Sequence, residues 1–154
     1  MEFGCSTASS VYSYRVVNDD CNCEEYHTSD RMNNVDYFFR GHYKMGDGVF
    51  TTIDVEFTNR SSDTLTLGLG TVKVSSRNIP YQYNDKFLPL PPLTIAPHQT
   101  EMIQLTGKSL DTEENWHKIA GEQLTLTLQG LRLGSAILPV TTVVFIPENP
   151  KLGR

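Results

Sequence analysis

The stretch VDYFFRGHYKMGDGVFTTIDVEFTN, residues 35–59, carries the clearest pattern in the chain. Mostly apolar and mostly polar side chains alternate on both sides of Gly46-Asp47-Gly48. This alternation is typical of half-buried strands, because successive side chains of a strand point to opposite faces of the sheet. The Gly-Asp-Gly sequence is a turn signal. The stretch therefore predicts a β-hairpin.

Further strand-like stretches extend from this hairpin in both directions. They lie at residues 11–17, 65–74, 79–83, 100–106, 124–133 and 137–146. The apolar positions change phase at Gly68 and Gly70, and again at Gly130. Because a shift of one residue sends side chains to the opposite face, we expect a bulge, a bend or a passage between sheets at these glycines.

The composition agrees with a fold made of strands. The 154 residues, about the length of one domain, include 16 Thr and 11 Val but 4 Ala and 6 Lys. Thr and Val fit the pleated surface of a sheet, whereas Ala and Lys favour helices. Turn signals recur at the spacing of a sandwich. The fold class predicted is an all-β, immunoglobulin-like antiparallel β-sandwich of seven to nine strands.

One helix and three segments complete the predicted organisation. Asp111 and Glu114 have the spacing of a capping box, which predicts a short helix at about residues 111–120 between two strands. Residues 1–34 form a polar N-terminal segment, a tether with a first strand at 11–17 and a loop from residue 18. Residues 35–148 form the sandwich domain, and residues 149–154 form a tail.

The charge distribution excludes several partners. The formal net charge is −5, and the 13 Lys and Arg residues are scattered singly rather than gathered in a basic stripe. Nucleic-acid binding is therefore not expected, and an anionic membrane surface is disfavoured. No run of 18 apolar residues predicts a membrane-spanning helix. Contact with a membrane is expected only through a lipid anchor.

Several stretches resemble small immunoglobulin-like domains of exported bacterial proteins, often lipoproteins. They are FTTIDVEFTNRSSDTLTL (Phe50–Leu67), VKVSSRNIPYQYN (Val72–Asn84), LTIAPHQTEMIQLTG (Leu93–Gly107) and TTVVFIP (Thr141–Pro147). The resemblance implies a sandwich fold and an extracytoplasmic location in the periplasm or cell envelope. The Cys…Trp…Cys hallmark of antibody domains is absent, because no cysteine follows Cys23.

Gly4-Cys5-Ser6 looks like the junction at which a lipoprotein is cleaved and its cysteine lipidated. Cys5 is therefore a candidate lipid anchor, and the alternative is an ordinary cysteine in the N-terminal segment. Residues 1–3 have neither the basic nor the apolar region of a signal peptide. The chain is accordingly either cytosolic or a mature form whose leader was replaced.

Cys21, Cys23 and His27 form the densest group of metal-ligand side chains. Thiolates and imidazoles bind zinc and copper, but C-x-C is not the usual zinc spacing and a fourth ligand is not evident. The alternatives are a disulfide between Cys21 and Cys23 and a pair of inert thiols. Lipidation of Cys5 would leave an even pair, which favours a disulfide in an oxidising compartment.

Other motifs have a plain structural interpretation. The four histidines lie in separate predicted elements, and no G-x-S-x-G or H-E-x-x-H sequence occurs, so an enzyme is not expected.

Asp54 and Glu56 share one face of a strand, where solvated charges are expected. Residues 86–92 fit an SH3-ligand pattern, but inside a sandwich they indicate an edge crossing. Asn59-Arg60-Ser61 is a glycosylation sequon in a predicted turn.

These observations favour a non-enzymatic, extracytoplasmic interaction or structural module, the soluble part of a lipoprotein. Its partner is expected to be another protein or a component of the cell envelope, bound at a sheet face, an edge strand or the loops at one end. No cofactor is expected. The alternative is a metal-binding or redox protein that uses Cys21, Cys23 and His27. A hydrolase with an unrecognised site is a weaker alternative.

Overall fold

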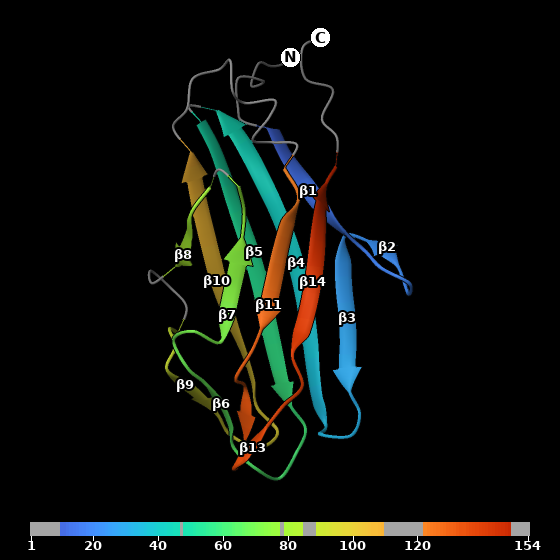
Figure 1. Ribbon diagram of the computed structural model, residues 1–154, viewed down its shortest axis with the longest axis vertical. Helices are drawn as coiled ribbons and strands as arrows, with labels where there is room; N and C mark the ends of the chain where they lie inside the picture. Colours follow the sequence, from blue (N-terminus) through green and yellow to red (C-terminus); the bar gives the residue numbers. More distant parts are fainter. Residues whose placement is uncertain (1–9, 47, 78, 85–88, 110–121, 149–154) are drawn as a thin grey trace, which may run out of the picture.

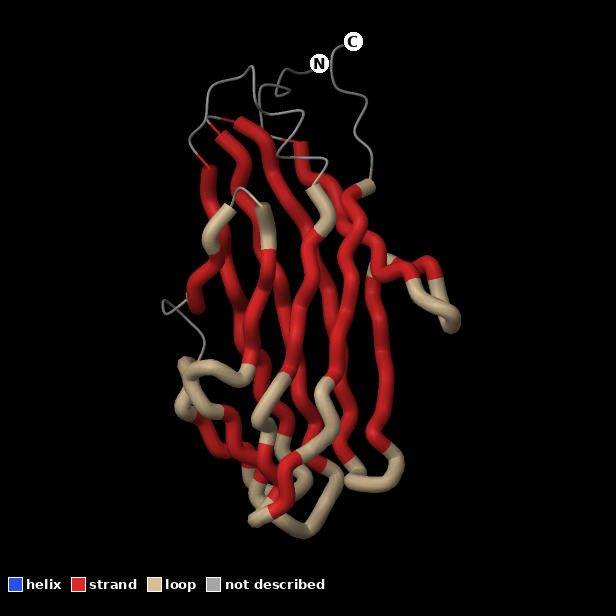
Figure 2. Tube along the Cα trace, viewed as in Figure 1, coloured by secondary structure: helices blue, strands red, loops and turns tan. Residues whose placement is uncertain are grey.

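A computed structural model describes residues 10–46, 48–77, 79–84, 89–109 and 122–148. These parts of the chain consist of strands joined by loops and turns, and they contain no helix (Figure 2). The helix predicted at about residues 111–120 lies outside the described residues, as does Cys5. Among the described residues no helix is long and apolar enough to cross a membrane.

One antiparallel sheet of ten strands forms most of the molecule (Figure 1). Its order is β7-β11-β14-β1-β4-β5-β10-β8, with β2 also paired to β1 and β3 to β4. The bounds are β1 Ser10–Val17, β2 Asn22–Cys23, β3 Glu25–Asp30, β4 Val35–Gly46, β5 Gly48–Asn59, β7 Val72–Ser75, β8 Tyr81–Tyr83, β10 Thr100–Ser109, β11 Leu124–Leu128 and β14 Thr141–Pro147.

The sheet folds over on itself at β1. Residues 10–13 of β1 pair with β4, whereas residues 14–16 pair with β14. The strands on either side of this crossing form two layers, one of β3, β4, β5, β10 and β8 and the other of β2, β1, β14, β11 and β7 (Figure 1). Gly41 lies on β4 where β1 departs, and a Cβ there would stand 2.8 Å from Ile53 Cδ1 and 3.2 Å from Tyr14 Cδ2. Glycine therefore allows the two layers to approach each other at the crossing.

The predicted hairpin is confirmed and lies at the centre of its layer. β4 and β5 pair in register from Val35 with Asn59 to Gly46 with Gly48. β5 then pairs along its other edge with β10, from Val49 with Ser109 to Thr58 with Thr100. Because β5 has a partner on both sides over nearly its whole length, the alternation of its side chains is fixed along the full strand.

The phase changes at glycine mark passages between two sheets, as predicted. A second, four-stranded sheet has the order β13-β12-β6-β9 and lies at the lower end in Figure 1. Its strands are β6 Leu65–Leu67, β9 Leu93–Ile95, β12 Arg132–Leu133 and β13 Ala136–Ile137. Gly68 and Gly70 separate β6 from β7 of the large sheet, and Gly130, at a φ of 77°, separates β11 from β12. The described residues therefore form fourteen strands, more than the seven to nine predicted.

The prediction of a loop from residue 18 was wrong, because this segment contains β2 and β3. β3 has the polar sequence EYHTSD, yet it pairs with β4 from Glu25 with Arg40 to Asp30 with Val35. As an edge strand it needs few apolar side chains, and Tyr26 supplies the contact with the core by stacking 6.1 Å from Phe39. Main-chain pairing with β4 thus determines the strand more than side-chain hydrophobicity does.

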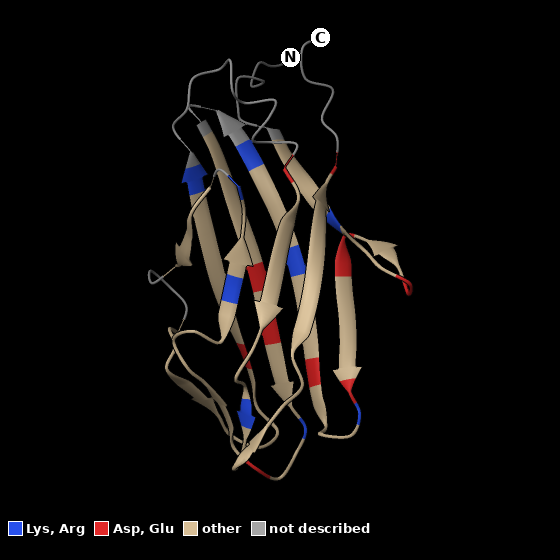
Figure 3. Cartoon of the chain, viewed as in Figure 1, with Lys and Arg blue, Asp and Glu red and all other residues tan. Residues whose placement is uncertain are grey.

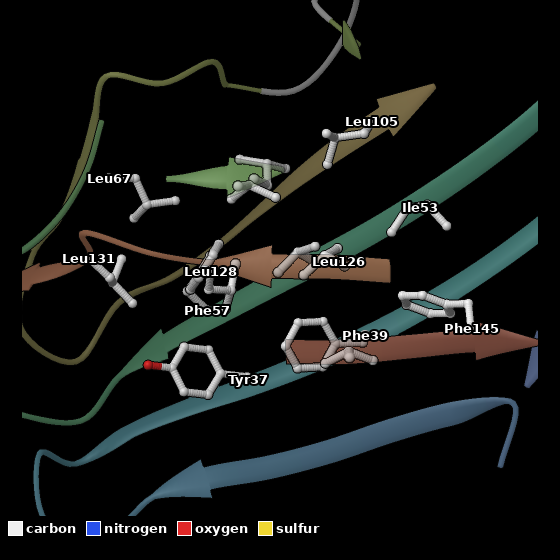
Figure 4. Close-up of a cluster of buried hydrophobic side chains, with 14 of the residues drawn as sticks. Tyr37, Phe39, Ile53, Phe57, Leu67, Leu105, Leu126, Leu128, Leu131 and Phe145 are labelled. Carbon is white, nitrogen blue, oxygen red and sulfur yellow. The ribbon is translucent and has the colours of Figure 1, made fainter. Parts of the chain in front are cut away.

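The core lies between the two layers. Figure 4 shows Phe39, Ile53 and Phe57 of one layer directed toward Leu126 and Phe145 of the other. All five side chains are fully buried. Burial of a large apolar side chain contributes roughly 1.5–3 kcal/mol, so this cluster supplies much of the free energy that holds the layers together.

Asn59 ties the large sheet to the small one at the end of β5. Its side chain is fully buried, and its Nδ2 donates hydrogen bonds to the carbonyl oxygens of Asp63 and Ile95 at 2.8 and 3.0 Å. Its Oδ1 accepts from the N–H and the hydroxyl of Ser61. In the folded protein the amide of this sequon is therefore inaccessible, and Asn59 serves as a structural residue rather than a glycan acceptor.

We predict that Asn59→Ala lowers the free energy of unfolding by about 2–3 kcal/mol, because two buried carbonyl groups lose their donor. Ser62→Ala provides the matched control, since Ser62 lies in the same turn with an exposed side chain. It is expected to change stability by less than about 0.5 kcal/mol. Urea unfolding measures both, and equal midpoints for the two variants would contradict the structural role of Asn59.

Candidate functional site

Cys21 and Cys23 lie on an arm that projects from the sandwich and includes β2 (Figure 1). The structure joins the two cysteines by a disulfide bond. Arg15 holds the arm on β1 by donating hydrogen bonds to the side chain and the carbonyl oxygen of Asn22 at 2.6 and 2.7 Å. The Cys21 and Cys23 sulfurs are thus bonded to each other. The residues that flank the disulfide, Asp20 and Glu24, are exposed to solvent.

His27 lies on β3 with an exposed side chain, and its ring centroid is 4.6 Å from that of Phe38. Among the described residues no group of three or more His, Cys, Asp or Glu side chains is placed to hold a metal ion. The ring beside His27 belongs to Phe38, which has no atom that binds a metal ion. Metal binding by Cys21, Cys23 and His27 stays a prediction.

Asp54 is buried within a polar row that crosses the outer face of one layer. The register places Glu25, Arg40, Asp54 and Gln104 side by side on β3, β4, β5 and β10. Arg40 donates to Asp54 Oδ2 from Nε at 3.1 Å and from Nη2 at 2.8 Å, and Gln104 Nε2 donates to Oδ1 at 2.7 Å. The hydrogen bonds that Arg40 donates to Asp54 raise the pKa of Arg40. Asp54 is 2% exposed, so the expectation of a solvated charge was wrong.

Asp36 and Asp54 of this face are each paired with an arginine. Asp36 lies at another register position, where Arg60 Nε and Nη2 donate to it at 2.7 and 3.0 Å. Burial alone would raise the pKa of Asp36, but the hydrogen bonds from Ser29 and Arg60 outweigh it and lower the pKa. Asp36 is therefore held ionised by its arginine, and Asp54 is paired with Arg40 in the same way.

The strongest candidate for a binding site is a groove between β7 and β8, the two ends of the strand order (Figure 1). It has a volume of about 630 Å³ and is called the edge groove below. Its apolar lining consists of Leu69, Val72, Val74, Ile79, Tyr83 and Leu105. Leu69 is 68% exposed. At this groove, apolar residues that adjoin the core are accessible to solvent.

Main-chain groups of both bordering strands point into the edge groove. The N–H and C=O of one residue lie on the same side of a strand, and the side alternates from residue to residue. Thr71 accepts from Gln129 beyond the end of β11, so Val72 and Val74 point the other way. Asn84 donates to Gln104 next to β10, so Tyr81 and Tyr83 of β8 also point away from their partner strand. No strand of the described residues pairs with these two edges, so both are open to a further strand.

Tyrosine side chains close the two ends of the edge groove. The Tyr83 hydroxyl lies 3.1 Å from the carbonyl oxygen of Leu69 and 3.3 Å from that of Val72, so its single proton is shared across the groove. The Tyr81 hydroxyl accepts from Thr51 Oγ1 at 2.7 Å, and burial raises its pKa to about 12. The nearby Tyr14 hydroxyl has no hydrogen-bond partner of good geometry. The hydroxyl group of Tyr83 thus reaches from β8 across the groove to main-chain carbonyl oxygens at β7.

Sequence patterns place β7 and β8 but do not reveal the groove. Each strand is short and lies beside a turn signal, Gly70 before β7 and Pro80 before β8. Which strands become edges depends on the order of all ten strands, and that order is set by contacts distant in sequence. Leu69 continues the alternation of Leu65 and Leu67 in the sequence, so no local signal shows that it is exposed at the rim of the groove.

Comparison with known proteins supports the fold. No family model and no curated protein matches the chain. The crystal structure of the GAE domain of GGA2p from Saccharomyces cerevisiae, an immunoglobulin-like β-sandwich, is 13% identical, with a TM-score of 0.50, and covers 89% of this chain and 99% of that one. A functionally unknown protein from Listeria monocytogenes EGD-e is 11% identical, with a TM-score of 0.52, and covers 92% and 85%. At these identities the likeness shows the fold alone.

We predict that Arg40→Leu lowers the free energy of unfolding by about 2 kcal/mol, because it leaves the Asp54 carboxylate buried beside an apolar side chain. The double variant Arg40→Leu with Asp54→Leu should regain part of this loss, since no charge is then left unpaired. Glu25→Gln is the control, because Glu25 pairs with Arg40 at 3.7 Å on the exposed side. Urea unfolding of the variants gives the coupling, and a strictly additive double variant would contradict the pairing.

Proposed function

We propose that this chain is a non-enzymatic protein-interaction module that binds an extended segment of a partner protein as an additional strand on the free edge of β7. The observation that carries the proposal is the edge groove, in which two open strand edges border an exposed part of the core. Unpaired N–H and C=O groups in a row are satisfied by another extended main chain, which is how edge strands recruit partner segments.

The lining of the edge groove specifies the kind of segment. Every second side chain of a bound strand would point inward onto the floor that Leu69, Ile79 and Leu105 form. Lys73 gives the rim a positive charge, because its side chain is exposed and forms no ion pair with a carboxylate of the described residues. The segment is therefore expected to alternate apolar residues with polar ones and to carry acidic residues toward this rim.

Tyr83 occupies part of the place that the partner segment would take. Its hydroxyl is a hydrogen-bond donor to the Val72 carbonyl, which is the role that an N–H of an added strand would have. Binding would move the phenol aside and exchange one donor for another, so the edge stays satisfied in both states. This internal donor protects an otherwise open edge from pairing with other copies of the chain.

Val74→Pro tests the proposal, because it removes an N–H that faces the groove and takes no part in the pairing of β7 with β11. The probe is a displayed library of random 12-residue peptides, selected on the purified chain. We expect selected peptides to alternate apolar and polar residues, to include acidic residues, and to bind the Val74→Pro variant at least about tenfold more weakly.

Val74→Thr is the matched control, since it keeps the N–H and the shape of the side chain and should keep the affinity. Unfolding of both variants checks that β7 is intact. Hydrogen exchange gives a separate measurement: the amide of Val74 should exchange rapidly in the free chain and become protected with peptide. Peptides that bind Val74→Pro as tightly as the original chain would refute strand addition at β7.

We further propose that the module is extracytoplasmic and is anchored by a lipid on Cys5. Support comes from the Gly4-Cys5-Ser6 sequence and from the disulfide that joins the half-buried Cys21 and Cys23, which suits an oxidising compartment. Mass spectrometry of the protein from its native cells should show a diacylglycerol thioether on Cys5 as the first residue. An unmodified Cys5 inside a longer chain would exclude the anchor, and bound zinc or copper in elemental analysis would favour the metal-binding alternative.

A further inference from the structure

On the outer face of the β4–β5–β10 layer, away from the core, one phenylalanine has a lysine next to it on each neighbouring strand. The register places Lys44 of β4, Phe50 of β5 and Lys108 of β10 directly beside one another. Lys44 Nζ lies 5.7 Å from the centroid of the Phe50 ring, and Lys108 Nζ lies 4.9 Å from it. Two ammonium groups from different strands therefore converge on one aromatic ring.

The two ammonium groups lack a counter-charge among the described residues. No ion pair joins either lysine to a described carboxylate. The next row of the same face consists of His42, Thr52 and Thr106, and the first carboxylate beyond it, Asp54, is already paired with Arg40. Figure 3 shows blue segments near the upper ends of β4 and β10, with the red segments of the same layer farther down. In a chain of net charge −5, this end of the face is a local positive site.

A pocket of about 410 Å³ opens beside the Phe50 ring, where β8 ends and β10 continues. Its wall combines the ring with Lys108, the hydroxyl residues Thr52 and Thr106, the amide residue Gln82, and Pro80. Gly107 also lines it, and a Cβ there would stand 2.5 Å from Ile79 Cγ2 and 2.9 Å from Thr51 Oγ1. The absence of a side chain at Gly107 lets β8 approach β10 and shapes this end of the pocket. We call it the lysine notch.

We propose that the lysine notch binds an anionic sugar, a ring that carries both hydroxyl groups and a carboxylate or a phosphate. The aromatic face suits the C–H side of a sugar ring, and the threonine hydroxyls and the Gln82 amide offer donors and acceptors to its hydroxyl groups. Lys108 lines the notch and supplies the charge that an anionic substituent needs, and Lys44, on the other side of β5, adds positive charge near the Phe50 ring. A simple inorganic anion would leave the ring and the hydroxyl groups unused, and a neutral sugar would leave the lysines unused.

This site is separate from the edge groove in chemistry and in place. The notch lies on the outer face, whereas the apolar floor of the groove lies between the layers, and the two share only the short stretch Pro80–Gln82. Lys73 borders the groove and is absent from the notch. A failure of peptide binding at β7 would therefore leave the sugar proposal intact, and the reverse also holds.

The test is a titration of the ¹⁵N-labelled chain, followed by NMR, with glucuronate, glucose 6-phosphate, glucose, acetate and inorganic phosphate. We expect glucuronate or glucose 6-phosphate to shift the amide signals of Phe50, Thr52, Thr106 and Lys108, with an affinity at least about fivefold above that for the other three compounds. The affinity should fall as the salt concentration rises. The comparison of the two anionic sugars identifies the charged group.

Lys108→Met should weaken binding about fivefold, because it removes the charge that lines the notch and keeps the apolar stem. Lys44→Met should weaken binding less, because Lys44 lies near the Phe50 ring but outside the lining. Lys73→Met has the same charge change at the edge groove and should have no effect. Equal affinity for glucose would show that the lysines are not used, and equal affinity for acetate or phosphate would show an adventitious anion only. Either result, an absence of shifts, or unchanged binding by both lysine variants overturns the proposal.

Discussion

The pairing of one strand with both layers is the constraint on which this sandwich depends. β1 is hydrogen-bonded to β4 along its first half and to β14 along its second half, so the two layers are a single folded sheet rather than two separate sheets. Gly41 provides the room for this crossing, because any side chain there would meet Ile53. A continuous sheet has two terminal strands, and folding brings these ends, β7 and β8, to the same side. The edge groove is therefore a product of the topology and not of one local motif.

Local patterns predicted the elements in which one face is buried. The β4–β5 hairpin was predicted because its strict alternation reflects a half-buried sheet, and the passages between sheets were predicted because Gly70 and Gly130 interrupt that alternation. β3 was missed, because an edge strand is held by main-chain hydrogen bonds that leave no mark on side-chain hydrophobicity. Asp54 was misjudged for a related reason: its burial comes from Arg40 and Gln104, which lie on other strands.

The candidate sites were less predictable than the fold. Cys21 and Cys23 attracted notice as chemical groups close in sequence, and the structure places them together on one arm. The edge groove and the lysine notch consist of ordinary valines, tyrosines, threonines and lysines, and they become sites only when the register sets them side by side. The spacing of Lys44, Phe50 and Lys108 in the sequence carries no motif, since the three residues meet through pairing across three strands.

The position of β1 also bears on how the protein is made. β1 is the first strand of the sandwich to be synthesised, yet half of its partner groups belong to β14, the last strand. Most of the close contacts in the fold likewise join residues far apart in sequence. A nascent chain would therefore carry an unsatisfied first strand until β14 has left the ribosome, and the two layers would close in a late, cooperative step. Folding of this domain is thus expected to finish only after β14 has been synthesised.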